Sequence, residues 1–303
     1  MVRRRRTAIT LVCVLAVLCG AATAAAAQGE PAWVAYERGR QAFRAGEFGE
    51  AVRMFRGAIE RGGPYPEAEA AIGEVYLVEG SLGLAERQFQ RAIRQRGALA
   101  VPEDEFSLWY RLAEVYELLE NPRAYELALR EIVERDERYR DDEYSSEREG
   151  YRRVVREEGL DRLLVLYRQP DDFARKAHAL LGEHYLRTGN YGRAVEHLLF
   201  AAIKVLSELI EIELERDPRY EFSSVSALLD RVEQRRETRE YLGETGLYRM
   251  MYYLGSALYG DDPSLSTARV IWETVSEREA AGDWARRAAE QVADPTLEPL
   301  IDY

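Results

Sequence analysis

The chain has few residues in the combinations that catalysis or metal binding requires. Its three histidines, His178, His184 and His197, lie close together in the sequence, which would suit a metal site if their side chains converged. His178 and His184 are six residues apart, so on one helix they point to different faces, unlike ligands spaced by four residues. We therefore expect solvated or hydrogen-bonded helix histidines and no metal site.

Adjacent carboxylates could act as an acid and base pair, and Asp104-Glu105 and Glu157-Glu158 are examples. With 54 acidic residues such pairs arise by chance, and a solvated helix face explains them. The chain has no Gly-rich phosphate loop, no Gly-x-Ser-x-Gly elbow, no His-Glu-x-x-His motif and no calcium loop. We predict no catalytic residue and no cofactor, and the protein is not expected to be an enzyme.

The N-terminal residues have the pattern of a secretory signal peptide, assigned to residues 1–27. Arg3 to Arg6 are positive, Ile9 to Leu18 are apolar, and Ala21 to Ala27 offer small-residue cleavage sites. The pattern predicts an exported, periplasmic protein. Two alternatives remain open: a lipid anchor at Cys19, and retention of the uncharged segment 7–28 as a membrane anchor.

The mature chain has an unusual charge and no cysteine. Both cysteines, Cys13 and Cys19, lie in the predicted signal, so disulfides and thiolate chemistry are excluded from the mature chain. Removing Arg3 to Arg6 takes the basic count from 42 to 38 against 54 acidic residues, which gives a net charge of −16. Because an acidic protein repels phosphate backbones, nucleic-acid binding is disfavoured.

A repeat of 34 residues indicates the elements that must position any functional side chain. Gly39, Ala51, Phe55 and Ala58 recur as Gly73, Ala85, Phe89 and Ala92, and again as Gly182, Ala194, Leu198 and Ala201. This pattern resembles the tetratricopeptide repeat (TPR), a helix-turn-helix unit. The resemblance implies small residues where two helices cross closely, and a bulky residue that fills the remaining space. If Gly39, Gly73 and Gly182 faced water, this interpretation would fail.

The resemblance predicts an all-α, TPR-like α-solenoid, a right-handed superhelix with inserted helices and a closing helix near 283–292. The predicted repeats are 32–65, 66–99, 106–139, 175–208 and 248–282. They form an N-terminal region, 28–140, and a C-terminal region, 171–303, separated by a connector and helix at 141–170. The third copy is degenerate because Tyr125 stands where a small residue is expected.

The segments outside the repeats are expected to be helical or charged. Residues 140–150 are predicted to be a charged connector, and Tyr151 to Arg168 a helix with an apolar stripe. The second helix of the repeat at 175–208 is expected to continue to Asp217, and Ser223 or Ser224 to cap a further helix.

In the TPR family the first helix of each repeat lines a concave groove that binds peptides or partner helices. Its groove positions, carried onto this sequence, combine aromatic residues with arginines, the types that dominate binding hot spots. The candidate partner-binding residues are Trp33, Tyr36, Arg40, Phe43, Arg44, Glu74, Tyr110, Arg111, Glu114, Lys176, Glu183, Arg187, Tyr252 and Tyr259.

The resemblance and the predicted export together favour a scaffold or adaptor that binds another protein or peptide of the cell envelope. Contact with a membrane is expected only if the N-terminus is lipidated or uncleaved. The alternative is a small-molecule or transport-accessory protein, in which the helices at 151–168 and 223–242 close a pocket. A third class, an enzyme on a helical solenoid, would need converging titratable residues in a cleft.

Overall fold

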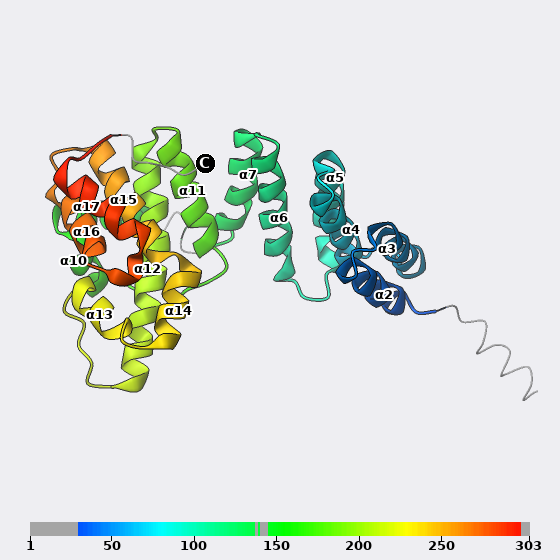
Figure 1. Ribbon diagram of the computed structural model, residues 1–303, viewed down its shortest axis with the longest axis horizontal. Coiled ribbons are helices and arrows are strands. Elements are labelled where there is room, and N and C mark those ends of the chain that lie inside the picture. Colours follow the sequence, from blue (N-terminus) through cyan, green and yellow to red (C-terminus); the bar gives the residue numbers. More distant parts are fainter. Residues whose placement is uncertain (1–29, 137–138, 140–144, 298–303) are drawn as a thin grey trace, which may run out of the picture. The chain divides into compact units, whose positions relative to one another are not determined.

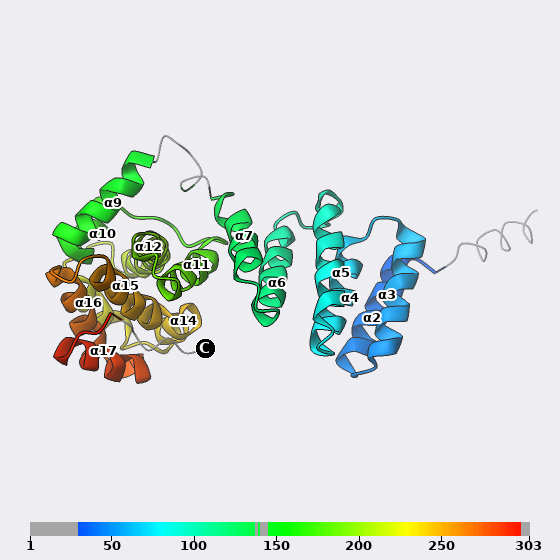
Figure 2. The ribbon, with the colours of Figure 1, turned by 90° about the horizontal axis from the view of Figure 1, so that it is seen from above.

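The computed structural model describes residues 30–136, 139 and 145–297, which are helical with no β-strand among them (Figures 1 and 2). The chain divides into two compact units, 1–119 and 120–303. The predicted signal peptide and residues 140–144 of the predicted connector lie outside the described residues. All-α architecture is confirmed for the part of the chain that the structure describes.

From residue 30 onward, unit 1 consists of two helical hairpins and one further helix. Its helices are α2 (Ala32–Arg44), α3 (Phe48–Gly62), α4 (Pro66–Val78), α5 (Leu82–Arg94) and α6 (Asp104–Leu118), with a short 3-10 turn at Arg96–Ala98. The boundary between the units falls in the turn of the third predicted repeat. That repeat therefore contributes α6 to unit 1 and its second helix to unit 2, which differs from the predicted region 28–140.

Unit 2 contains the remaining repeats and the inserted helices. Its helices are α7 (Pro122–Val133), α9 (Ser145–Glu157), α10 (Gly159–Leu166), α11 (Arg175–Arg187), α12 (Tyr191–Arg216), α13 (Val225–Val232), α14 (Arg236–Thr245), α15 (Leu247–Asp261), α16 (Ser266–Ser276) and α17 (Asp283–Ala293). The long helix α12 packs between α11 and α15 (Figures 1 and 2).

The glycine crossings predicted from the 34-residue period are confirmed. A Cβ atom added to Gly39 would lie 2.6 Å from the Phe55 ring, and one on Gly73 would lie 3.0 Å from the Phe89 ring. At Gly182 it would lie 2.5 Å from Leu198 Cγ. Since real Cβ contacts are longer, a side chain at any of these positions would force its neighbour to shift, and the large side chain occupies the space that glycine leaves.

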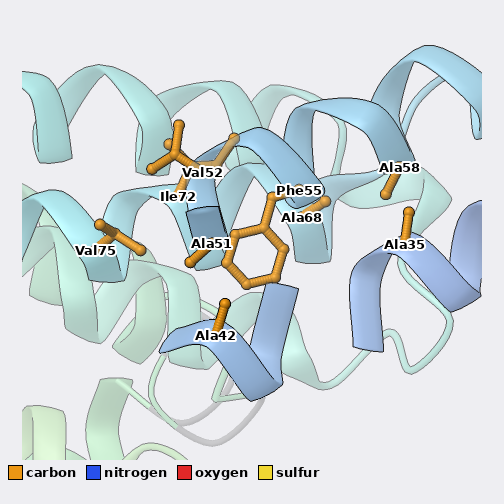
Figure 3. Packing of buried hydrophobic residues seen from close by; sticks show 9 residues of the cluster. All are labelled: Ala35, Ala42, Ala51, Val52, Phe55, Ala58, Ala68, Ile72 and Val75. Carbon is orange, nitrogen blue, oxygen red and sulfur yellow. The ribbon is translucent and has the colours of Figure 1, made fainter. Parts of the chain in front are cut away.

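The core of unit 1 shows how this arrangement stabilises a hairpin. The Phe55 ring lies among Ala42, Ala51 and Ala68, which come from α2, α3 and α4 (Figure 3). Phe55 is 1% exposed, and burying a phenylalanine side chain contributes about 1.5–3 kcal/mol. The small residues bring the helix backbones close enough for one ring to contact all three helices.

Two predicted segment boundaries were wrong. The connector was expected to extend to Gly150, but α9 begins at Ser145. The helix expected from Tyr151 to Arg168 is divided into α9 and α10 and ends at Leu166. The break has a backbone cause, because Gly159 adopts a φ of 83°, in the left-handed region that glycine tolerates best.

Other local predictions are confirmed. Helix α12 continues to Arg216, and Asn190 at its start accepts a hydrogen bond from the Arg193 N–H. Ser224 caps α13 by accepting from the Ala227 N–H at 3.1 Å. Helix α17 covers part of α15 and α16, as expected of a closing helix.

Candidate functional site

The first helices of unit 1 form a pocket of about 470 Å³, which we call the unit 1 groove. A volume of this size is within the range of ligand sites. The groove is lined by Tyr36, Arg40, Phe43, Phe55, Glu67, Ala70, Ala71, Glu74, Phe89, Leu99, Asp104, Ser107, Leu108 and Arg111. It is thus built from α2, α4 and α6. Phe55 and Phe89, the bulky residues that fill the glycine crossings (the knobs), reach it from α3 and α5.

Aromatic rings form much of the groove's apolar surface. The ring of Tyr36 lies 5.6 Å from that of Phe55 and 5.2 Å from that of Tyr65. Burial raises the pKa of the Tyr36 phenol, while Arg40 partly opposes the shift. Phe43, half-buried at the end of α2, packs against Phe48 with 5.8 Å between the ring centroids. The rings are held by neighbours, so they present a rigid apolar surface to a ligand.

The charged side chains of the groove are partly paired. Arg111 Nε lies 2.8 Å from Glu74 Oε1, and its Nη1 lies 2.8 Å from Glu114 Oε2. Burial raises the pKa of Glu74, and the nearby Arg111 counteracts that shift. Arg40 pairs with Glu37 on its own helix at 3.1 Å, with both side chains well exposed. Arg40 can exchange that partner for a ligand at little cost, because exposed pairs are weak.

The structure brings together some of the predicted residues of unit 1 and leaves others out. Tyr36, Arg40, Phe43, Glu74 and Arg111 all line the unit 1 groove. Four others are not among the lining residues: Trp33, Arg44, Tyr110 and Glu114. Trp33 is 62% exposed near the start of α2, and Glu114 contributes only through its pair with Arg111.

Sequence reasoning found only Arg111 of the wall that α6 provides and missed Asp104, Ser107 and Leu108. Asp104, Ser107, Leu108 and Arg111 line the groove at spacings of i, i+3, i+4 and i+7, so they form one helical stripe. The family positions instead pointed to Tyr110 and Glu114. Because α6 is the last helix of the wall, its side toward α4 faces the groove. The spacing of the stripe could be read from the sequence, but the sequence did not show that this side of α6 would face the groove.

In unit 2 the predicted groove residues do not form an open surface. Glu183 Oε2 pairs with Arg249 of α15 at 2.5 Å, and the Arg249 guanidinium lies over the Tyr253 ring. Tyr252 is 1% exposed, and its ring lies 5.5 Å from that of Trp284 in α17. The prediction of Tyr252 as a groove residue was therefore wrong, because the closing helix covers it.

The other predicted residues of unit 2 do not converge on one site. Lys176 and Arg187 are exposed on α11. Tyr259 is half-buried, with its ring 5.7 Å from that of Trp272, the knob of the last repeat.

The histidines lie in the interior of unit 2 and two of them converge, contrary to the reading from spacing alone. Nδ1 of His178 lies 2.9 Å from Nδ1 of His197, between α11 and α12. His178 Nε2 faces the carboxylate of Asp136 at 3.8 Å, so we place its proton on Nε2 and infer that His197 donates through Nδ1. Burial lowers the pKa of both histidines. Of the two environments expected from the sequence, solvated or hydrogen-bonded, His178 and His197 have the hydrogen-bonded one.

A buried lysine completes this polar cluster. Lys204 is 1% exposed, and its Nζ lies 3.0 Å from Asp136 Oδ2 and 2.5 Å from Asp172 Oδ2. Burial raises the pKa of Asp136, but hydrogen bonds and charges from His178 and Lys204 outweigh burial and hold that pKa well below its usual range. The cluster links the end of α7 to α11 and α12, so it stabilises the packing of unit 2.

The described residues have neither a metal site nor a membrane-spanning helix. Within them no group of three or more histidine, cysteine, aspartate or glutamate side chains has the arrangement of a metal site. In the same residues, no helix combines the length and apolarity needed to cross a bilayer.

A second pocket, of about 430 Å³, lies in unit 2 where the inserted helices meet the last repeat. Its apolar floor includes Leu160, Val225, Met251 and Ile271, and its rim carries hydroxyl groups together with Glu157, Glu158 and Asp161. Asp161 Oδ1 accepts a hydrogen bond from the Val225 N–H at 2.7 Å, which fixes α13 beside α10.

No protein-family model matches the chain. An uncharacterized protein of Treponema pallidum (strain Nichols) is 26% identical over 227 residues, which cover 74% of this chain and 60% of that protein. An uncharacterized protein of Borreliella burgdorferi (strain B31) is 23% identical over 254 residues, covering 76% and 78% respectively. The chain therefore spans less than two thirds of the length of the Treponema relative.

Two solved structures match the chain over most of its length. YrrB, a TPR protein with an unusual peptide-binding site, has a TM-score of 0.42 at 15% identity, covering 84% of this chain and 90% of YrrB. The TPR2AB domain of yeast Sti1, in its pHSP90 complex, has a TM-score of 0.32 at 14% identity, covering 86% and 97%. The repeat assignment for this chain rests on its own glycine crossings, described above.

Proposed function

We propose that this tetratricopeptide-type repeat protein is a non-catalytic adaptor that holds a peptide segment of a partner protein in the unit 1 groove. The observation that carries the proposal is the groove itself. Three successive first helices leave an aromatic surface open, with Arg40 and Ser107 exposed at its edges. Rigid aromatic side chains beside arginine are the composition of binding hot spots.

Site-specific cross-linking tests this proposal. A photoreactive amino acid would replace Arg40 or Ser107 in the groove, and Arg53 or Glu60 on α3 as matched exposed controls outside the lining. We expect a partner protein to cross-link through the two groove positions and not through the controls. A partner captured only through Arg53 or Glu60 would contradict the proposal.

We also propose that the adaptor works outside the cytoplasm, on a protein of the cell envelope. The support is the sequence of residues 1–27, with its positive, apolar and small-residue segments in order. Mass spectrometry of the protein isolated from its own cells tests this. A mature N-terminus near Gln28 is expected. A lipidated Cys19 or an intact Met1 would indicate one of the two anchored alternatives.

Small-molecule binding in unit 2 is the second candidate, and the 430 Å³ pocket is the observation that favours it. The inserted helices α10 and α13 line this pocket, which lies away from the predicted groove residues. Its lining has no aromatic or basic side chain that would fix a ligand's orientation. Ligand-induced thermal stabilisation that is lost on Val270→Trp, at the exposed edge of the pocket, would support it.

A further inference from the structure

The unit 1 groove has an uneven distribution of charge, and this distribution bears on the chemistry of the partner proposed above. Helices α2, α4 and α6 are first helices of successive repeats, so they run in the same direction. Tyr36, Glu67 and Asp104 come from the earlier part of their helices, whereas Phe43, Glu74 and Arg111 come from the later part. The groove thus has two ends that differ in their side chains.

The two arginines of the groove are paired to different degrees. Arg111 is shared by Glu74 and Glu114, both at 2.8 Å, and Arg40 pairs with Glu37. An acidic group of a ligand would have to compete with these carboxylates. Arg111 is therefore a poor basis for recognising an acidic partner, which leaves Arg40, with its weak exposed pair, as the only groove arginine that could attract one.

The negative charges at the other end are not neutralised in the same way. Within the described residues, no basic side chain forms an ion pair with Glu67 or Asp104, and Glu67 Oε1 accepts a hydrogen bond from the Ala100 N–H at 2.8 Å. Burial raises the pKa of Tyr65, and the charges of Glu67 and Glu37 raise it further. This second effect follows from the same carboxylates, which lie close enough to the aromatic rings to act on Tyr65.

The aromatic surface and the carboxylates together fit one kind of side-chain pair. Apolar groups of Tyr36 and Leu99, both half-buried, provide a surface for a bulky apolar side chain, with the buried Phe55 and Leu108 beneath it. An ammonium or guanidinium group beside it would lie near Glu67, Asp104 and the face of Tyr36, where carboxylates and an aromatic ring both attract a cation.

We infer that the partner segment carries a lysine or arginine next to a bulky apolar residue, with the cation held by Glu67 and Asp104 and the apolar side chain on the aromatic surface. This inference rests on the proposed function, since it specifies the ligand of the same groove. It excludes an acidic peptide as the preferred ligand.

A random-sequence peptide library displayed on phage tests the inference directly. It would be selected on the chain from residue 28 onward, and the selected peptides measured by fluorescence anisotropy. We expect enrichment of lysine or arginine beside phenylalanine, leucine, methionine or tryptophan. Binding to the double variant Glu67→Gln/Asp104→Asn should be about tenfold weaker or more, as expected when a charge-assisted hydrogen bond is lost.

The control is Glu60→Gln/Glu79→Gln, which changes the net charge equally at two exposed positions outside the groove. It should bind the selected peptides as the wild type does. Ser107→Trp, at an exposed lining position, should block the groove without disturbing the core.

The outcomes separate the inference from the proposed function. Peptides that Ser107→Trp blocks, but that bind the carboxylate double variant as tightly as the wild type, would overturn the inference and leave the groove as the binding site. A selection that yields no peptide sensitive to Ser107→Trp would overturn both. Equal weakening by the control double variant would mean that overall charge, and not these two carboxylates, attracts the peptides.

Discussion

Units 1 and 2 use the same helix crossing but treat the exposed face of their first helices differently. In unit 1, Gly39 and Gly73 contact aromatic knobs, and the inner face of α2, α4 and α6 stays open as a groove. In unit 2, Gly182 and Gly255 contact Leu198 and Trp272 in the same way, yet the face of α15 is covered.

The covering of unit 2 comes from elements outside the repeats. Trp284 of α17 packs on Tyr252 and Tyr253, and Arg249 bridges to Glu183 of α11. The interior of unit 2 also holds charges, including Lys204 and Glu213, which are 1% and 0% exposed. The comparison shows that the repeat pattern specifies how helices pair, whereas additional helices decide whether the paired helices leave a binding surface.

The largest effect is expected from removing the buried lysine of unit 2. Lys204→Ala leaves Asp136 and Asp172 without their shared cation, and breaking a buried ion pair costs about 3–5 kcal/mol. The control is Lys176→Ala, because Lys176 is the chain's other lysine and is exposed. Hydrogen exchange should increase throughout unit 2 and stay unchanged in α2–α5. Equal exchange in the two variants would contradict the structural role of the cluster.

The second prediction tests whether the glycine crossings of the two units are equally tight. At Gly182 a Cβ would meet the Leu198 backbone nitrogen at 3.0 Å as well as its side chain, whereas at Gly73 it would meet only the edge of the Phe89 ring at 3.0 Å. Gly182→Ala should therefore destabilise unit 2 by about 1–3 kcal/mol. Gly73→Ala should change stability by less than about 1 kcal/mol, because a shifted ring offsets the better helix propensity of alanine. Urea unfolding followed by circular dichroism measures both, and the reverse order would contradict the difference.

The repeats were predictable because their signal is local. Gly39, Gly73 and Gly182 recur at a fixed distance from their knobs, and a helix crossing needs only these residues. The pairing of His178 with His197 was not predictable from spacing on one helix, because His197 lies on the partner helix α12. The burial of Tyr252 depends on Trp284, which follows it by 32 residues and belongs to no repeat. Contacts between elements outside the period leave no periodic signal.

The candidate site was predictable only in part for a similar reason. Tyr36, Arg40 and Phe43 occupy one stripe of α2, and the family positions identified them correctly as lining residues. For α6 the predicted residues were Tyr110, Arg111 and Glu114, and of these only Arg111 lines the groove, together with Ser107, which was not predicted. Which side of an end helix faces a groove depends on what packs against it, and that information is tertiary.

The third prediction uses the fact that unit 1 has no histidine. Burial lowers the pKa of His178 and His197 in the folded state, so the unfolded chain binds more protons below about pH 6.5. The two histidines therefore stabilise unit 2 fully above that pH, and this stabilisation is lost as the pH falls toward their folded-state pKa values. Unit 2 should lose up to about 1.4 kcal/mol per pH unit for each histidine between pH 6.5 and 5. Asp136, whose folded pKa is lowered, adds a separate loss only below about pH 4.

Hydrogen exchange at a series of pH values, corrected for intrinsic exchange rates, separates the two units in this experiment. The pH dependence should be confined to unit 2 and should flatten in His197→Gln, whatever that substitution does to stability at pH 7. An equally steep dependence in α2–α5 would mean that groups other than this pair control it.

The smallest effect on stability is expected from the ion pair of the unit 1 groove, which is the open counterpart of the Lys204 cluster. Glu74 and Arg111 are 2.8 Å apart, but the Arg111 side chain is 47% exposed. Water screens such a pair, so Glu74→Gln should lower the free energy of unfolding by no more than about 1 kcal/mol. The same urea titration measures this loss, and the matched control is Glu79→Gln, at an exposed position outside the lining.

A loss as large as that for Lys204→Ala would mean that the groove is closed in solution. A small loss combined with altered peptide binding would show that this exposed pair of unit 1 serves recognition, whereas the fold encloses the Lys204 cluster of unit 2.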